Sequence, residues 1–179
     1  MAERDGVVRE LKAGRAFVTS VFDAQLDTYF LFEPATGRAV HWNRAFSEIT
    51  GYSDEEIAAL PAPASYYDAE ELRRAVPFVE EVMRTGSGTI ELELVCKDGS
   101  RVPTEYRVSV VPDDEGEPRY LVSIGRDVSR RKAVEEALRQ QRRMLQTLLS
   151  NLPGMAYRCR NDPAWTMVFV SDGCEPLTG

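Results

Sequence analysis

The strongest constraint on the fold is a pair of alternating segments that meet at Asp98-Gly99. Residues 88–96 (GTIELELVC) place an apolar side chain at every second position, and residues 102–110 (VPTEYRVSV) place Val, Thr or Tyr in the same way. A period of two indicates strands with one buried face. Asp-Gly is a strong signal for a two-residue hairpin turn of type I′. The chain is therefore expected to contain an antiparallel sheet with one face packed against other elements.

Two further segments extend this sheet. Residues 28–32 (TYFLF) and 38–42 (RAVHW) are β-rich and are separated by the turn sequence EPATG, which predicts a second hairpin. Residues 119–125 (RYLVSIG) follow a polar turn and predict the last strand. Their alternation is poor, so the sequence does not show which face of this strand is buried.

Capping signals mark helices between the two hairpins. Asn43 can cap a short helix that ends at Gly51, where a left-handed residue is expected. Ser53-Asp-Glu-Glu56 has the pattern of a capping box and favours a second short helix. A longer helix is predicted from Asp68 to Gly86. Pro77 is expected to kink or split it, because the proline ring clashes with the preceding turn.

Helical spacing also marks the segments before and after the strands. Residues 7–22 carry one apolar stripe, weakened by Gly14. Residues 129–152 show apolar residues at 4-3-4-3-4 spacing, an a/d seam with one polar member. The seam consists of Val134, Leu138, Gln141, Leu145, Leu148 and Leu152. About three heptads are marginal alone, so a homodimer helped by flanking domains is expected.

Charge and cysteine usage exclude several kinds of site. The chain has 179 residues and a formal net charge of −7, which argues against nucleic acid because phosphate binding needs a basic surface. Cys96, Cys159 and Cys174 form no CxxC pair, and His41 is the single histidine, so no metal site is expected. No apolar run reaches the length of a membrane span. The charged start differs from a signal peptide, so a cytoplasmic segment without membrane contact is expected.

The sequence offers no catalytic constellation. Nucleophilic chemistry would have to rest on His41, which has no acidic partner at a recognisable spacing. The carboxylates at 55–56 and 70–71 are explained by helix starts, and no glycine-rich phosphate loop is present. We therefore expect no enzymatic activity within this chain.

The last residues of the chain resemble an earlier stretch. A shift of 128 positions lays residues 29–51 over residues 157–179 without a gap. A repeat of such a long period indicates tandem domains of one fold, joined by the helix at 129–152. Residues 153–179 are then expected to be the truncated start of a second domain, because so short a segment cannot bury enough surface to fold alone.

Three motifs resemble the PAS family of sensor domains. They are Asn43…Ile49-Thr50-Gly51-Tyr52-Ser53…Glu56-Ile57, the hairpin Lys97-Asp98-Gly99-Ser100, and Gly125-Arg126-Asp127-Val128-Ser129 before the helix. The last is similar to the family's strand-end Asp-Ile-Thr signature, with Val128 for Ile and Ser129 for Thr. The resemblance implies an α+β fold in which short helices flank a five-stranded antiparallel sheet. The expected order along the chain is an N-terminal helix (1–23), the sensor domain (24–128) and the linker helix (129–152).

The resemblance places any ligand between the sheet and the helices. Strand alternation puts Val40 and Trp42 on one face, which the family pattern turns toward this space, while His41 faces away. Core filling is the competing interpretation for Trp42, Tyr66 and Tyr67, because large aromatics are ordinary core residues. The candidate pocket residues are Val40, Trp42, Phe46, Tyr66, Leu92 and Tyr106.

The sequence does not identify a cofactor. Haem-binding relatives take an axial histidine from the long helix, and residues 69–85 contain none, so haem is not expected. Light-oxygen-voltage photochemistry needs the cysteine of a Gly-x-Asn-Cys-Arg-Phe segment, and residues 60–68 (LPAPASYYD) contain none. A covalent flavin adduct is therefore excluded, whereas a non-covalently bound flavin stays open.

The resemblance implies a sensory input and dimerisation module of a bacterial-type signal-transduction protein. A change around the sheet would move the last strand and, through it, the helix at 129–152. Gln141 favours this interpretation, because a polar seam residue costs stability and fixes register. Asp127 can cap the helix and stiffen the joint. The expected output is a histidine kinase; the alternatives are a diguanylate cyclase or a ligand-free structural spacer.

Overall fold

The computed structural model describes residues 14, 16–151 and 154–174. The chain divides into two compact units, one up to Ser129 and one from Arg130 onward. Residues 16–23 are helical, and the rest of the helix predicted at 1–23 lies outside the described residues except for Gly14. The elements that follow in the first unit are β1 (Thr28–Glu33), β2 (Arg38–Trp42), α2 (Arg44–Thr50), α3 (Asp54–Ala59), α4 (Ala69–Thr85), β3 (Ser87–Val95), β4 (Arg101–Pro112) and β5 (Pro118–Asp127).

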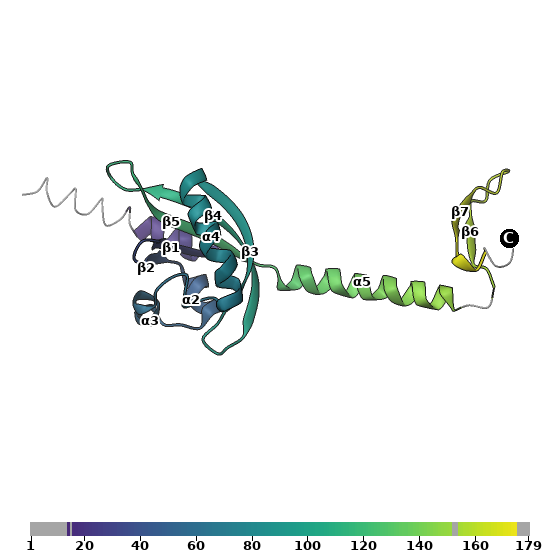
Figure 1. The fold of residues 1–179 in the computed structure, drawn as a ribbon, viewed down its shortest axis with the longest axis horizontal. Coiled ribbons are helices and arrows are strands. Elements are labelled where there is room, and N and C mark those ends of the chain that lie inside the picture. Colours follow the sequence, from purple (N-terminus) through teal and green to yellow (C-terminus); the bar gives the residue numbers. More distant parts are fainter. Residues whose placement is uncertain (1–13, 15, 152–153, 175–179) are drawn as a thin grey trace, which may run out of the picture. The chain divides into compact units, whose positions relative to one another are not determined.

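The first unit is built on a five-stranded antiparallel sheet with the order β2-β1-β5-β4-β3. The last strand in the chain, β5, is therefore the central strand, paired with both β1 and β4. Figure 1 shows α4 crossing one face of the sheet, and α4 packs against β3 and β4. This confirms the expected α+β architecture.

The hydrophobic core lies between the sheet and the helices. Ile57, Val82 and Leu121 are fully buried there, from α3, α4 and β5 respectively. The buried face of β5, which the sequence left undecided, is the one that carries Leu121. Ile124 lies on the opposite face and is 39% exposed.

The predicted capping residues begin their helices. The Asn43 side chain accepts a hydrogen bond from the Phe46 amide, and Ser53 with Glu56 forms the complete capping box. Asp68 accepts hydrogen bonds from the amides of Glu70 and Glu71 at the start of α4. Local hydrogen-bonding chemistry therefore sets where these helices start.

The hairpin between β3 and β4 differs from the predicted type I′ turn. Such a turn needs positive φ at both central residues, and of the pair Asp98-Gly99 only Gly99 has it, with φ of 82°. The Gly99 amide donates to the Cys96 carbonyl, and the Cys96 amide donates to the Ser100 carbonyl. Asp98 keeps negative φ because its carboxylate accepts the Ser100 amide at 2.9 Å. The connection is a three-residue loop with a left-handed glycine.

Pro77 does not split α4, which runs over 17 residues from Ala69 to Thr85. Of the two predicted effects of Pro77, a kink or a split, the split was wrong. Proline removes one main-chain hydrogen bond, but Ala75 before it and Val82 after it are both buried on the sheet side. Packing of both halves against the core keeps the helix continuous.

The edge strand β2 carries a bulge. Leu31 pairs with His41 and Phe32 with Ala39, so Val40 has no partner in the register. The extra residue reverses the inward and outward alternation beyond it. Trp42 lies opposite Phe30 and packs against the core, in line with the core-filling interpretation, whereas Val40 is displaced and 39% exposed. The prediction that Val40 and Trp42 share one face was therefore wrong for Val40.

The second unit contains α5, which spans Ser129–Ser150 and includes the last residue of the first unit, followed by β6 (Tyr157–Cys159), β7 (Met167–Val170) and a short 3₁₀ helix (Asp172–Cys174). No residue of α5 is buried. The predicted seam residue Leu152 and the repeated Leu177-Thr178-Gly179 lie outside the described residues. Of the helices that the structure describes, none has both the length and the apolar character needed to span a membrane.

Candidate ligand cavity

A cavity of about 50 Å³ lies between the core face of the sheet and helices α2 and α4. Every strand of the sheet except β2 contributes to its wall, and the segment between α3 and α4 closes it. The lining residues are Phe30, Phe32, Phe46, Ala62, Pro63, Tyr66, Tyr67, Ala75, Phe78, Val79, Ile90, Leu92, Leu94, Tyr106, Val108 and Ser123. None of them is charged.

Aromatic rings form one end of the cavity. Phe30 and Phe46 stack with their centroids 4.5 Å apart, and the Tyr66 ring meets both edge-on at 5.6 and 5.3 Å. Edge-on and offset arrangements are the favoured geometries for such rings. The Tyr66 carbonyl also accepts the Val95 amide at 2.9 Å, which ties this segment to the end of β3. The position of Tyr66 is therefore fixed by both its ring and its backbone.

Two tyrosine hydroxyls in the cavity wall make no hydrogen bond of good geometry among the described residues: those of Tyr66 and Tyr106. The Tyr106 hydroxyl nevertheless lies close to the side chains of Tyr67 and Thr104, which favour its ionised form. Tyr66 has no such polar neighbour in the described part of the chain. The side chains of Tyr66 and Tyr106 are 2% and 4% exposed, respectively. Buried polar groups in proteins are paired with few exceptions. Burial raises the pKa of Tyr66 and of Tyr106 to about 12, so both hydroxyls stay protonated at neutral pH. Each can donate a hydrogen bond to a ligand in the cavity.

Tyr106 connects the cavity wall to the central strand. It lies directly opposite Gly125 in the β4–β5 register. A Cβ atom at Gly125 would lie 2.6 Å from Cε1 of Tyr106 and 2.5 Å from Oγ1 of Thr28. Only glycine fits under the ring at this position. The Tyr106 ring therefore rests directly on the β5 backbone, two residues before Asp127.

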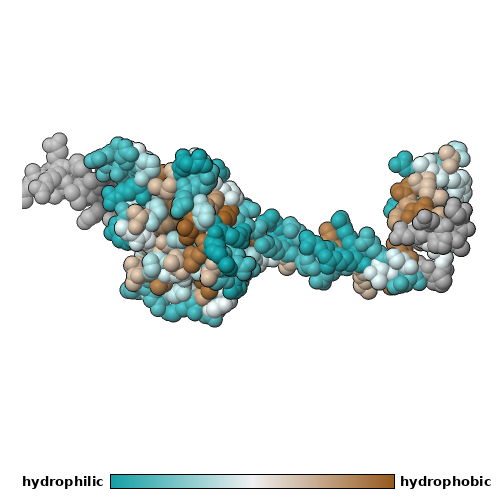
Figure 2. Space-filling view, in the orientation of Figure 1, coloured by the Kyte–Doolittle hydropathy of each residue, from teal (hydrophilic) through white to brown (hydrophobic). Residues whose placement is uncertain are grey.

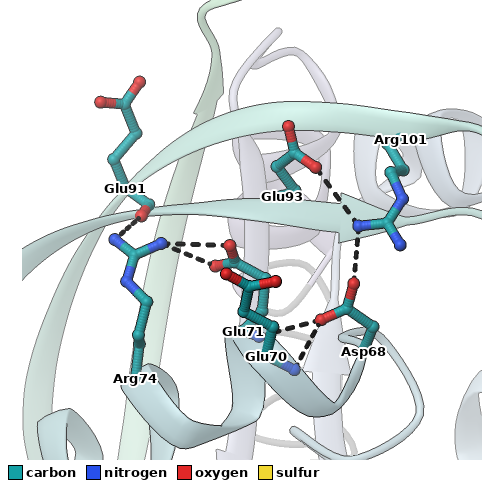
Figure 3. A network of polar contacts seen from close by, with 7 residues as sticks. All are labelled: Asp68, Glu70, Glu71, Arg74, Glu91, Glu93 and Arg101. Carbon is teal, nitrogen blue, oxygen red and sulfur yellow. Dashed lines mark hydrogen bonds and ion pairs between the residues drawn. The ribbon is translucent and has the colours of Figure 1, made fainter.

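Ion pairs hold the first turn of α4 against β3 and β4 (Figure 3). Oδ2 of Asp68 lies 2.7 Å from Nη1 of Arg101, which also meets Glu93 at 3.3 Å. Hydrogen bonds from the Glu71 amide, and then the one from Arg101, hold the pKa of Asp68 below its ordinary value.

A second arginine reinforces this contact. Arg74 pairs with Glu71 on its own helix at 3.0 Å and donates from Nη2 to the Glu91 carbonyl at 2.8 Å (Figure 3). These exposed pairs contribute little stability individually. Together they position the helix turn that follows Tyr67, a cavity residue.

Four of the predicted pocket residues line this cavity: Phe46, Tyr66, Leu92 and Tyr106. Val40 and Trp42 do not. Val40 is the bulged residue of β2 and is 39% exposed. The Trp42 indole donates from Nε1 to Asp54 at 2.8 Å in a separate polar depression at the surface.

Several cavity residues were missed by sequence reasoning. Phe30 and Phe32 could have been found from the alternation of TYFLF, which places both on one face. Phe78 has no such signal, since it follows Pro77 within α4. Its ring packs against Gly88, where a Cβ atom would lie 2.8 Å from it. This contact joins α4 to β3, and the spacing of residues within either element does not reveal it.

The chemistry outside the cavity is limited. Among the described residues, no cluster of three or more His, Cys, Asp and Glu side chains could hold a metal ion. The Cys96 thiol is buried and donates to the Ile49 carbonyl at 3.2 Å. His41 packs edge-on against Phe22 and Tyr29. The cavity is the candidate site because it brings together four of the predicted pocket residues and two buried hydroxyls.

Comparison with known proteins identifies the family of this chain. A family model described as a PAS domain matches residues 26–130. The aerobic respiration control sensor protein ArcB of Escherichia coli is 30% identical over 138 residues, which are 76% of this chain and 18% of that protein. The methyl sulfide methyltransferase-associated sensor of Methanosarcina acetivorans is 27% identical over 143 residues, 78% of this chain and 14% of that protein. The chain thus spans less than a fifth of these relatives.

Solved structures share the fold. A PAS domain from Colwellia psychrerythraea superposes with a TM-score of 0.58 at 20% identity, over 67% of this chain and 98% of that one. A PAS domain from a two-component sensor histidine kinase gives a TM-score of 0.54 at 16% identity, over 65% of this chain and 97% of that one. At these identities the likeness concerns the fold alone.

Proposed function

The chain belongs to the PAS domain family, and from this premise we propose that it is the sensory input and dimerisation module of a longer signalling protein. Its relatives include proteins named as sensors and a sensor histidine kinase, TmoS. A histidine kinase is therefore the favoured output domain. A diguanylate cyclase, or a ligand-free spacer role, is the alternative. The module itself has no catalytic role and acts in the cytoplasm.

The observation that carries this proposal is the path from the cavity to the start of α5. The Tyr106 ring lies over Gly125 on the central strand, and β5 continues to Asp127. The Val128 side chain is 4% exposed, and its amide donates to the Pro103 carbonyl at 2.9 Å. Oδ1 of Asp127 accepts the Ser129 amide at 2.7 Å. A shift of Tyr106 would therefore reach the first residue of α5 through main-chain contacts.

Asp127 acts one position earlier than a standard helix cap. Its carboxylate accepts the amide two residues ahead, an Asx turn, and the helix begins at Ser129. This bond and the buried Val128 anchor the end of β5 on two sides. A displacement of β5 is then transmitted to the helix start and not absorbed by a loose connection.

In this proposal α5 mediates dimerisation. The seam residues Val134, Leu138, Leu145 and Leu148 are each about half exposed or more. The rest of the helix surface is mostly hydrophilic (Figure 2). Apolar residues at heptad spacing are buried when two such helices pair in parallel. A second copy of this chain supplies that partner.

Replacing Gln141 in the seam with leucine is expected to tighten the dimer about tenfold, because a buried polar residue is exchanged for an apolar one. Gln146→Leu is the matched control, since Gln146 lies on α5 outside the seam. Sedimentation equilibrium of the full chain measures both dissociation constants. A Gln141→Leu dimer no tighter than the wild type, or equal tightening by Gln146→Leu, would show that α5 does not pair through this seam.

We also propose that the hairpin β6–β7 belongs to a second PAS domain. With the 128-residue shift, β7 (Met167–Val170) falls on residues 39–42. Val168 is skipped in the β6–β7 register as Val40 is in β1–β2. Ser171 exchanges two hydrogen bonds with the backbone of Ala156, as Asn43 does with that of Tyr29, although the same shift lays Ala156 over Thr28, so the register of β6 differs by one residue. Apolar residues lie exposed on this hairpin (Figure 2): Tyr157, Met167, Val168 and Phe169.

A further inference from the structure

The two buried hydroxyls define what the cavity can bind. Tyr66 and Tyr106 both line it, and both are more than nine-tenths buried. Each hydroxyl carries one hydrogen that it can donate and lone pairs that can accept. A ligand oxygen within reach of Tyr66 would satisfy a hydroxyl that has no partner among the described residues. One within reach of Tyr106 would replace its weak contacts with Tyr67 and Thr104.

The volume of the cavity restricts the ligand to a small molecule. A cavity of about 150 Å³ holds benzene, and roughly 10–15 Å³ is enough for one water molecule. The volume of about 50 Å³ lies between these limits and corresponds to about two heavy atoms on the benzene scale and about four on the water scale, so about four is the upper bound. Flavin and haem are far larger than benzene, so neither fits unless the walls move apart.

The walls also restrict the charge of the ligand. All the lining residues are uncharged, and most are aromatic or aliphatic. The hydroxyls of Tyr66 and Tyr106 are neutral at physiological pH. An ion transferred into such surroundings would lose its hydration without gaining a counter-charge. An uncharged ligand avoids this loss of hydration free energy.

We propose that the cavity binds a small uncharged oxygenated molecule, a ketone or alcohol of at most about four heavy atoms. Its carbon atoms contact Phe30, Phe46 and Leu92, and its oxygen accepts a hydrogen bond from the hydroxyl of Tyr66 or Tyr106. This inference rests on the proposed sensory function and names the class of molecule that is sensed. Affinity is bounded by size: four heavy atoms allow a dissociation constant no tighter than roughly 40 μM.

The test uses three probes with four heavy atoms each: acetone, 2-propanol and the charged acetate. Each is titrated into the full chain, and the amide and methyl shifts of the cavity residues are followed by NMR. Acetone or 2-propanol is expected to saturate these shifts in the millimolar range, with acetate at least tenfold weaker. Saturation by acetate at the same concentration would contradict the charge argument and overturn the inference.

Variants that remove one hydroxyl each test which atoms recognise the oxygen. Tyr66→Phe and Tyr106→Phe keep the rings, and at least one of them is expected to weaken acetone binding about three- to tenfold. Tyr120→Phe is the control, because Tyr120 lies on β5 but does not line the cavity. Xenon serves as an apolar probe, and its binding should be the same in all variants.

The outcomes separate this inference from the proposed function. Xenon shifts without acetone shifts would show an accessible cavity that does not select oxygenated molecules, which would overturn the inference alone. Unchanged acetone binding in both Tyr→Phe variants would do the same. The proposed coupling between Tyr106 and α5 does not depend on any ligand. It is tested separately, by substitutions in the cavity wall.

Discussion

Replacing Asn43 with alanine is expected to lower the free energy of unfolding of the first unit by about 3 kcal/mol. The side chain is 1% exposed and makes four hydrogen bonds. Its Oδ1 accepts the amides of Tyr29 at 2.9 Å and Phe46 at 3.1 Å. Its Nδ2 donates to the carbonyls of Phe22 at 3.1 Å and Asp27 at 3.0 Å. Alanine leaves all four backbone groups without these partners.

Graded variants test this explanation. Asn43→Asp keeps the acceptor bonds but loses both donors, and Asn43→Ser keeps a capping oxygen. Both are expected to fall between the wild type and Asn43→Ala. Urea unfolding can be followed by Trp42 fluorescence in a Trp165→Phe background, because the chain has two tryptophans. A free energy of unfolding for Asn43→Ala within about 1 kcal/mol of the wild-type value, roughly the contribution of one hydrogen bond, would show that the four hydrogen bonds of Asn43 do not stabilise the first unit as expected.

Truncating Leu121 to alanine is expected to destabilise the first unit by about 3 kcal/mol, within the range for buried leucines. Leu121 is fully buried on the central strand, where β1 and β4 pair on either side of it. The structure around a central strand cannot collapse readily into the space that is left. Both the lost burial of apolar surface and the new cavity then contribute.

Leu26→Ala is the matched control for this prediction, because the same atoms are removed from a side chain that is 92% exposed. Its effect should stay within about 0.5 kcal/mol. Unfolding of both variants is measured under identical conditions. Similar losses of stability in the two variants would mean that β5 is not packed as the core strand of the sheet.

Features that depend on neighbouring residues could be predicted from the sequence. The caps at Asn43, Ser53 and Asp68 are satisfied by amides two or three residues away, so the signal is local. Strand alternation around Asp98-Gly99 likewise placed β3 and β4 correctly. The turn type was wrong because the Asp98 carboxylate stabilises a three-residue loop, which the dipeptide alone does not reveal.

Features that depend on contacts between distant segments could not be predicted. The bulge at Val40 follows from how β2 pairs with β1, and it removed Val40 from the core side of the sheet. Trp42 stays opposite Phe30 and packs against the core without lining the cavity. The need for glycine at position 125 follows from the Tyr106 ring on the neighbouring strand. The continuity of α4 through Pro77 depends on packing against the sheet. Each of these features depends on tertiary contacts, which the pattern of neighbouring residues in the sequence does not indicate.

The central claim is that the cavity wall and the start of α5 are coupled through β5. Tyr106→Leu perturbs the wall above β5, and Phe46→Leu perturbs it from α2; both side chains are 4% exposed, so the losses of core packing are comparable. The measurement is amide hydrogen exchange at Val128 and Ser129, whose amides bond to Pro103 and Asp127. Tyr106→Leu is expected to speed exchange at both amides about tenfold more than Phe46→Leu does, which corresponds to about 1.4 kcal/mol of local opening. Equal effects of the two variants would contradict the coupling.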